Sequence, residues 1–128
     1  MGHPLVSVIM AVHNAEDTLK ESLASVLGQT FGNFEVIIVN DGSGDRTGDI
    51  LQLAAAQDSR VNVFTQGQRG LTNSLNRAIS VSQGQYLARQ DGDDLSMPER
   101  FEQQVRKLDG DEGLAAVGTA TVIIDKQG

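Results

Sequence analysis

The sequence has no cysteine, and only 4% of its 128 residues are aromatic. Without cysteine the chain can form no disulfide and can offer no thiolate ligand to zinc. Because aromatic residues are few, aliphatic side chains have to fill the core, and the hydrophobic fraction of 39% is compatible with one. A chain of this length is expected to fold as a single domain over residues 1–128.

Basic residues are outnumbered: ten Lys and Arg stand against 17 Asp and Glu, which gives a net charge of −7 and a pI near 4.6. This balance argues against nucleic acid as the main partner, because phosphates attract positive charge. An acidic balance is also an ordinary way for a protein to stay soluble. No apolar run approaches the ~20 residues of a membrane span, and the chain does not begin with a secretory signal. The sequence therefore predicts no membrane span and a cytoplasmic location.

Short apolar runs rich in β-branched residues alternate with segments of helical periodicity. The runs predict four strands at residues 5–12, 34–39, 61–64 and 85–89, of which the first two are expected to be buried. Strands that alternate with helices form βαβ units, so the expected fold class is α/β, with a three-layer α/β/α, Rossmann-like, mostly parallel sheet. A further strand-like segment at 114–125 ends the chain, and an uncovered apolar strand at that place would favour a homodimer.

Helices are expected where capping residues precede apolar periodicity. Asn14 is interpreted as the N-cap of a helix that Gly28 ends. Ser96 and Glu99 have the spacing of a capping box, which predicts another helix start. Apolar side chains at helical spacing predict the buried faces of the four helices: Leu19, Leu23, Val26 and Leu27; Ile50, Leu53 and Ala54; Leu71, Leu75, Ala78 and Ile79; Phe101, Val105 and Leu108.

Three polar loops follow predicted strands, at residues 11–14, 40–44 and 89–94. In open parallel sheets, ligands bind beyond the carboxyl ends of the strands. The three loops are therefore expected to lie on one rim of the sheet and to form the binding site together.

The third loop crowds three carboxylates, Asp91, Asp93 and Asp94, into four residues. Carboxylates this close repel one another unless a cation or a hydrogen-bond network holds them. The spacing Asp-x-Asp suits a hard divalent cation, which prefers oxygen ligands. A solvated acidic turn is the alternative, because Asp and Gly both favour turns.

Other polar residues on the rim allow two interpretations each. The carboxylate of Asp41 can accept hydrogen bonds from a base or a ribose, or it can cap the next helix. His13 can touch a ligand or stand in solvent. Arg69 and Arg89 can face phosphates or form salt bridges. The glycines within residues 42–48 have the wrong spacing for a dinucleotide-binding fingerprint.

Several blocks of sequence occur in order along nearly the whole chain: VSVIMAVHN at residues 6–14, SVLGQT at 25–30, FEVIIVNDGS at 34–43, and ARQDGDD at 88–94 followed by MPERF at 97–101. Together these blocks resemble family 2 inverting glycosyltransferases of the GT-A fold. The resemblance implies the nucleotide-binding half of such a fold.

The resemblance also implies roles for residues on the rim. Asp41 would bind the base of the nucleotide, and Asp91 with Asp93 would be the Asp-x-Asp pair, with Mg²⁺ or Mn²⁺ held by Asp93 between two phosphates. The metal ligands would be Asp93 and Asp91. The implied nucleotide-binding residues lie in the loops and on the helix after the third strand: Ala11, Val12, His13, Asn14, Asp41, Gly42, Arg69, Asn76 and Asp91.

The implied reaction transfers a sugar, with inversion, from a nucleotide-diphosphate donor to a saccharide or lipid-linked acceptor, as in cell-wall or polysaccharide biosynthesis. A UDP-sugar is the expected donor. Ala11, His13 and Asn40 depart from the residues frequent in the family. The acceptor-binding half, with its catalytic base, is expected to lie outside residues 1–128, so the base is left unassigned.

Two other classes of protein share some of these features. A non-catalytic module that captures nucleotide-sugars would also lack the base. A phosphorylatable response-regulator domain shares the length, the fold class and an acidic metal site. Its first strand should end in an acidic pair, whereas this strand ends in Ala-Val-His-Asn, and the lysine it needs on a late strand is missing from residues 114–124. The sequence therefore favours the glycosyltransferase interpretation.

Overall fold

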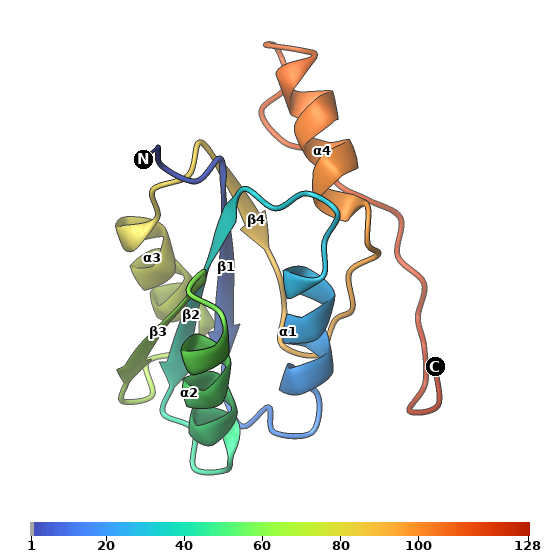
Figure 1. Cartoon of the computed structure of the whole chain (residues 1–128). Coiled ribbons are helices and arrows are strands. Elements are labelled where there is room, and N and C mark those ends of the chain that lie inside the picture. Colours follow the sequence, from blue (N-terminus) through green and yellow to red (C-terminus); the bar gives the residue numbers. More distant parts are fainter. Residues whose placement is uncertain (1) are drawn as a thin grey trace.

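The computed structural model describes residues 2–128, which form a parallel sheet flanked by helices (Figure 1). Strands and helices alternate along the chain as the sequence predicts. Their bounds are β1 Val6–Val12, α1 Leu19–Leu27, β2 Phe34–Asp41, α2 Thr47–Gln57, β3 Val61–Gln66, α3 Leu71–Val81, β4 Tyr86–Arg89 and α4 Arg100–Asp109.

The strands are arranged in the order β3-β2-β1-β4, and all three neighbouring pairs are parallel. Val6 at the start of β1 pairs with Phe34 on one side and Tyr86 on the other, so the carboxyl ends of the strands meet at one edge. The central strands β1 and β2 are buried almost throughout, which explains their continuous apolar sequence. The predicted α/β class is confirmed.

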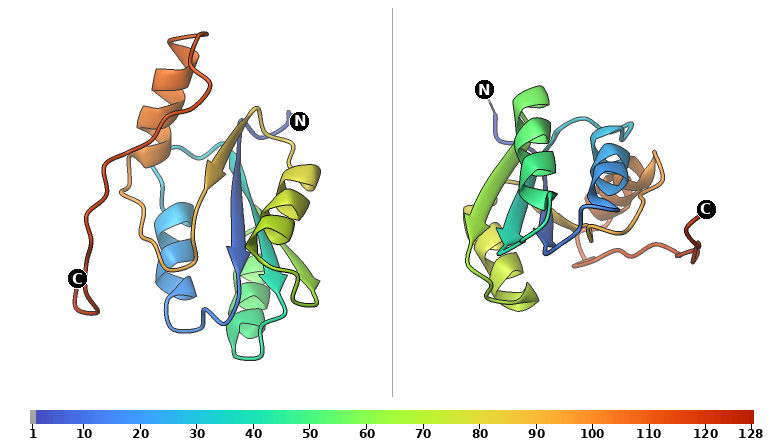
Figure 2. Two further views of the ribbon diagram at one scale, coloured as in Figure 1. Left: turned by 180° about the vertical axis from the view of Figure 1, so that it is seen from behind. Right: turned by 90° about the horizontal axis from the view of Figure 1, so that it is seen from below.

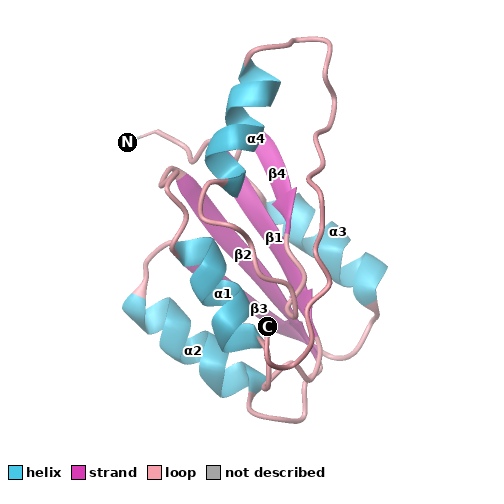
Figure 3. Ribbon diagram, turned by 90° about the vertical axis from the view of Figure 1, so that its right-hand side faces the viewer, coloured by secondary structure: helices cyan, strands magenta, loops and turns pink. Residues whose placement is uncertain are grey.

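Helices cover both faces of this sheet, as the views from behind and from the side show (Figures 2 and 3). On one face, alternate residues of β1 and β2 pack with side chains of α1 and α2, and the cluster includes Val8, Met10, Val36, Ile38, Leu19, Leu23 and Leu51. On the other face, Ile9, Ile37 and Val39 pack with Ala78 and Leu75 of α3. The period of two along the strands thus divides their side chains between two cores, and the three-layer architecture is confirmed.

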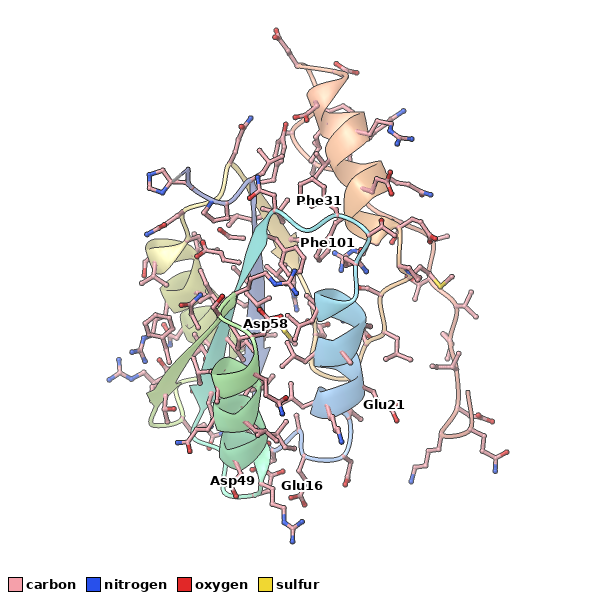
Figure 4. The ribbon with its side chains drawn as sticks, in the orientation of Figure 1. Glu16, Glu21, Phe31, Asp49, Asp58 and Phe101 are labelled. Atoms are coloured by element: carbon pink, nitrogen blue, oxygen red, sulfur yellow. The ribbon has the colours of Figure 1, made fainter. Side chains whose placement is uncertain are left out.

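Helix α4 is attached to the first core by two buried side chains, Phe101 and Val105. The rings of Phe101 and Phe34 meet edge to face, with their centroids 5.6 Å apart. Figure 4 shows Phe101 beneath α4 and close to Phe31, which packs against the same core. This anchor fixes where the chain returns after the acidic loop.

Two predicted helix starts are wrong. Helix α1 begins at Leu19, four residues beyond the expected start, and Asn14 has a φ of 50° instead of capping it. Helix α4 begins at Arg100, and the hydroxyl of Ser96 donates to Gln90 instead of closing a capping box. In both places a polar side chain that resembles a cap bonds elsewhere: Asn14 accepts from the N–H of Gly44, and Ser96 donates to the buried amide of Gln90. These contacts take precedence over the local capping pattern.

Some predicted core residues also lie outside the core. Leu53 is 60% exposed, and Leu71 and Ile79 are exposed as well. In α2 the fully buried apolar residue is Leu51, and a helix turns 100° per residue, so Leu53 points about 200° away from the direction of Leu51. Ile50 and Ala54 do pack against the core as predicted, so the prediction for this helix is wrong at Leu53.

Residues 114–125 form no strand, although their sequence favours one. Within residues 2–128 no backbone ladder pairs with them, and Val122 and Ile123 are 83% and 94% exposed. β-Branched residues favour a strand only where a neighbouring strand accepts their hydrogen bonds. The strand prediction is therefore wrong, and the homodimer that rested on it has lost its structural basis.

Truncation of the α4 anchor provides a test of this packing. Phe101→Ala should lower the free energy of unfolding by about 3–5 kcal/mol, because it removes a buried ring and leaves a cavity. Urea denaturation measures this loss. Leu53→Ala removes an exposed apolar side chain of the same domain and is the matched control, for which we expect a change within about 0.5 kcal/mol. Equal losses for the two variants would contradict the packing described here.

Candidate functional site

A pocket of about 440 Å³ lies at the edge where the carboxyl ends of the strands meet. The loops after β1 and β4 and the start of α3 surround it, which confirms that the polar ends of β1 and β4 share one rim. Its lining consists of Ala11, Val12, His13, Asn14, Ala15, Asp17, Thr18, Leu71, Arg89, Asp91, Gly92 and Asp93. Six of the predicted site residues are among these: Ala11, Val12, His13, Asn14, Asp91 and Asp93.

Two carboxylates of the acidic loop, Asp91 and Asp93, line this pocket, and that of Asp94 lies beside them. One oxygen from each of Asp91, Asp93 and Asp94 lies within 4.8 Å of the others, and all three side chains reach solvent. Partial desolvation raises the pKa of the Asp94 carboxyl above its ordinary value, and the charges of Asp93 and Asp91 raise it further. Such a set of hard oxygen donors, open on its solvent side, fits Mg²⁺ or Mn²⁺, which also keep water or phosphate ligands.

The backbone of the acidic loop is held by hydroxyl groups of α1. The Oγ of Ser22 donates to the carbonyl of Asp91 at 2.9 Å, and the Oγ1 of Thr18 donates to the carbonyl of Gly92 at 2.8 Å. One turn further along, Ser25 accepts a bond from the backbone N–H of Ser96 at 3.0 Å. The three hydroxyls follow one another at i, i+4 and i+7, so one helical face fastens the loop.

These hydroxyl groups were not predicted as site residues, although the sequence contains a signal for them. Ser22 is fully buried on a helix face that otherwise carries Leu19, Leu23 and Val26. A buried hydroxyl needs a partner, and the carboxyl edge of the sheet is the nearest place that offers one. Polar residues repeated on an apolar helix face therefore indicate a tertiary attachment.

The acidic loop also passes very close to β1. A Cβ added at Gly92 would lie 2.9 Å from a methyl carbon of Val12, closer than real Cβ atoms approach. Glycine is thus required at this position for the loop to rest against the floor of the pocket.

Asp41 ends β2 in a buried position, at 5% exposure. One carboxylate oxygen accepts bonds from the side-chain amide of Gln66 at 3.0 Å and from the N–H of Arg69 at 2.7 Å, and the other accepts from the N–H of Gly70 at 2.9 Å. The bond from Gln66 and the two backbone bonds lower the pKa of Asp41, against the effect of burial. Asp41 therefore ties β2 to the loop before α3 and does not cap the following helix α2.

His13 and Asn14 form a fixed pair at the end of β1. The Nδ1 of His13 lies 2.7 Å from the carbonyl oxygen of Asp41, and because a carbonyl can only accept, Nδ1 carries the proton. The other ring nitrogen, Nε2, lies 3.2 Å from the side-chain nitrogen of Asn14, which donates to it. Asn14 also accepts a bond from the N–H of Gly44 at 2.8 Å. The imidazole is thus held in one tautomer at the pocket wall.

Reciprocal bonds join the loop after β1 to the loop after β2. The N–H of Glu16 donates to Asp45 at 3.2 Å, and the N–H of Arg46 donates back to Glu16 at 3.0 Å, while Ala15 donates to the hydroxyl of Thr47 at 2.8 Å. The bond from the Thr47 hydroxyl, with backbone bonds, lowers the pKa of Asp45. Figure 4 shows Glu16 beside the N-terminal end of α2. This link between the two loops was not predicted from the sequence.

Other predicted residues lie outside the pocket lining. Gly42 has a φ of 69°, and a Cβ there would lie 2.7 Å from the N–H nitrogen of Gln68, so it shapes the backbone below Asp41. Arg69 and Asn76 are exposed, in the loop after β3 and on α3. Arg89 does line the pocket, and its Nε lies 3.2 Å from the Oδ1 of Asp91. The two side chains form an ion pair in which each is about half exposed.

The family model for glycosyl transferase family 2 matches residues 7–128. The chain belongs to this family. It is 42% identical over 127 residues to the putative glycosyltransferase EpsE of Bacillus subtilis, and 36% identical over 126 residues to an uncharacterized glycosyltransferase of Haemophilus influenzae. These matches cover 98% and 97% of this chain but only 46% and 39% of the relatives. The chain thus spans less than half the length of either relative.

Solved structures confirm that the fold is that of the GT-A glycosyltransferases. The mannosyltransferase PcManGT of Pyrobaculum calidifontis, in complex with GDP-Man and Mn²⁺, superposes with a TM-score of 0.73 at 23% identity over 84% of this chain and 33% of its own. TarS 1–349 of S. aureus, in complex with UDP-GlcNAc, superposes with a TM-score of 0.72 at 24% identity, and the match covers 91% of this chain and 37% of TarS 1–349.

The structure also answers the question of membrane spans. Among residues 2–128, no helix combines the length and the apolar character needed to cross a bilayer.

Because Asp41 is a buried carboxylate with a lowered pKa, we expect the stability lost on replacing it to depend on pH. Asp41→Asn puts an amide where three N–H groups need acceptors. We therefore expect the free energy of unfolding to fall by about 2 kcal/mol at pH 7. A lowered folded-state pKa stabilises the fold above the ordinary value of 3.8, and this stabilisation is lost as the pH falls through the lowered value. The difference from wild type should therefore narrow below about pH 4.

Urea denaturation of wild type and Asp41→Asn between pH 7 and pH 2.5 measures this difference. Glu112→Gln neutralises an exposed carboxylate and is the control, with an expected change within about 0.5 kcal/mol at every pH. A difference between Asp41→Asn and wild type that stayed constant down to pH 2.5 would show that the carboxylate charge is not what holds the loop before α3.

Proposed function

We propose that this chain is the donor-binding part of a metal-dependent glycosyltransferase that moves a sugar, with inversion, from a nucleotide-diphosphate carrier to a saccharide or lipid-linked acceptor. The observation that carries this proposal is the set of three carboxylates at a pocket on the carboxyl edge of a parallel sheet. Membership of glycosyl transferase family 2 supports the reaction class.

In this proposal Asp93, together with Asp91, holds Mg²⁺ or Mn²⁺. When bound, the cation supplies the positive charge that stabilises the departing diphosphate. Arg89 stands beside these carboxylates, where its guanidinium can turn toward a phosphate once Asp91 is engaged. The PcManGT structure contains Mn²⁺ together with a nucleotide-sugar, which supports a divalent cation here.

The base of the nucleotide is assigned to the side of the pocket near Asp41. A carboxylate offers about four acceptor positions, and three of those on Asp41 are filled by the protein's own N–H groups. The remaining position, on the oxygen bonded to Gly70, can accept one N–H of a base. Ala11, Val12, His13 and Asn14 form the adjoining wall, and Gly42, Arg69 and Asn76 take part from the surrounding loops and α3.

A UDP-sugar is the donor we propose. UDP-GlcNAc is bound by TarS, which has the same fold, whereas PcManGT binds GDP-Man. The catalytic base is not assigned to any residue of this chain. The cytoplasmic location expected from the sequence belongs to the same proposal.

The decisive experiment is thermal unfolding with Mn²⁺ and UDP, separately and together, with and without chelator. We expect UDP to stabilise the chain only when Mn²⁺ is present, because the cation links the carboxylates to the phosphates. Asp93→Asn should abolish the Mn²⁺-dependent part of the shift. In chelator alone this variant should be as stable as wild type or more so, because one repelling charge is gone.

Asp111→Asn is the matched control for that experiment, since Asp111 lies in the turn after α4 and its carboxylate accepts a bond from the nearby N–H of Gly113. It should keep the full Mn²⁺-dependent shift. An equal UDP shift in the presence of chelator would refute the role given to Asp93.

A module that binds nucleotide-sugars without turnover is the second candidate, because the rim of the sheet offers groups for a donor while the catalytic base is not assigned to any residue of this chain. Residues 1–128 are expected to bind donor and transfer little sugar, because general base catalysis contributes about 10²–10⁴-fold and acceptor positioning contributes more. A transfer assay with UDP-sugars separates the two: efficient transfer by residues 1–128 alone would place the base within this chain, and Asp94 is the first residue to substitute.

A further inference from the structure

Gln90 is a buried amide that connects both ends of the acidic loop. It lies between Arg89 and Asp91 and is 3% exposed. Its Nε2 donates to the carbonyl of Asp94 at 2.8 Å and to the Oγ of Ser22 at 3.2 Å. Since Ser22 in turn donates to the carbonyl of Asp91, one side chain holds the far end of the loop directly and the near end through a single hydroxyl.

The acceptor side of Gln90 is occupied as well. Its Oε1 accepts from the hydroxyl of Ser96 at 2.7 Å and from the Nη1 of Arg100 at 2.9 Å. An amide has two donor hydrogens and two lone pairs, so the hydrogen-bonding capacity of Gln90 is filled. A fully satisfied buried amide has one orientation, and it fixes the orientation of everything bonded to it.

Arg100 completes the support from the first turn of α4. Its guanidinium donates to Gln90, to the hydroxyl of Ser96 at 3.0 Å, to the carbonyl of Arg89 at 3.0 Å and to the side chain of Gln104 at 3.2 Å. All of these acceptors are neutral, and within residues 2–128 Arg100 makes no ion pair with a carboxylate. The planar guanidinium with its several N–H donors here joins three segments of the chain. The ammonium group of a lysine does not have the shape for this role.

We propose that Gln90 and Arg100 are positioning residues that hold the turn of residues 91–94 in its carboxylate-converging shape before any cation arrives. The inference deepens the proposed function, because it rests on Asp91 and Asp93 being metal ligands. Outer groups that orient metal ligands typically contribute 10–100-fold to metal affinity, and a turn shaped in advance does not have to be ordered by the ion.

The direction in which the Mn²⁺ affinity changes in one variant distinguishes a positioning role of Arg100 from an electrostatic role. Arg100→Met removes a positive charge near a cation site, so a purely electrostatic role predicts tighter Mn²⁺ binding. A positioning role predicts weaker binding, because the turn loses its support. Gln90→Leu is neutral and tests the same support without changing any charge.

The experiment has two readouts on the 128-residue chain. Mn²⁺ affinity is measured from the electron paramagnetic resonance signal of free Mn²⁺, and we expect both variants to bind about tenfold more weakly. Hydrogen exchange at the Asp94 amide is followed by NMR in chelator; this N–H donates to the carbonyl of Asp91 at 3.2 Å and closes the turn. We expect its exchange to be roughly tenfold faster in both variants, since the turn opens more often.

Arg60→Met is the matched control. Arg60 also joins several groups, bonding to Asp58 and to the carbonyl of Leu27, but it lies before β3 at the opposite edge of the sheet. Its loss should lower the melting temperature and leave both readouts unchanged. If Gln90→Leu does not fold, Ser22→Ala removes one link of the same chain of bonds and carries the test.

The outcomes are distinct. Faster exchange together with weaker Mn²⁺ binding supports the proposal. Unchanged exchange at Asp94 overturns it, whatever the affinity, and so does tighter Mn²⁺ binding by Arg100→Met. A wild-type chain that bound no Mn²⁺ would instead refute the metal site of the proposed function, while the exchange readout, which needs no metal, would still decide whether Gln90 and Arg100 shape the turn.

Discussion

Mutual repulsion among three carboxylates is the constraint on which the arrangement of this site depends. Asp91, Asp93 and Asp94 lie within 4.8 Å of one another, which an unsupported turn would not maintain. The structure opposes the repulsion with a hydrogen bond that a hydroxyl of α1 donates to the backbone carbonyl of Asp91, with a buried amide that donates to the carbonyl of Asp94, and with a guanidinium from α4 that donates to this amide. Arg89 forms an ion pair with Asp91, and the charge of Arg100 opposes the rise in the pKa of Asp94, so these two guanidinium groups neutralise the three carboxylates only in part. The cluster keeps negative charge for a ligand.

The strands and layers could be predicted because each depends on short stretches of sequence. A continuous apolar run such as Val6–Val12 has no stable place except between two covered faces. The errors arose where distant contacts decide the outcome. Asn14 and Ser96 have the chemistry of helix caps, but Asn14 bonds to Gly44 in another loop, and Ser96 bonds to Gln90, whose burial depends on the whole fold. Residues 114–125 have the composition of a strand without a neighbouring strand.

The site was predictable to a similar degree and for similar reasons. Acidic residues at a strand end can be read directly, since the rule for parallel sheets places such loops on one rim. The residues that hold the acidic loop cannot be predicted from the sequence in this way, because nothing distinguishes Gln90 from the other glutamines until its burial is known. Asp41 shows the same limit: its position follows from the sequence, but the N–H groups that donate to it come from Gln66 at the end of β3 and from the loop that follows, whose path only the fold defines.

The hydroxyl face of α1 has a consequence for exchanging parts between relatives. Ser22 and Gln90 are 68 residues apart in sequence but bond directly, and Thr18 fastens the same turn. Replacing α1 alone with its counterpart from another glycosyltransferase would import a different set of hydroxyls and would move the carboxylates with them. The module that can be transplanted is therefore discontinuous: it consists of α1 together with the acidic turn, and a functional chimera would have to take both from one parent.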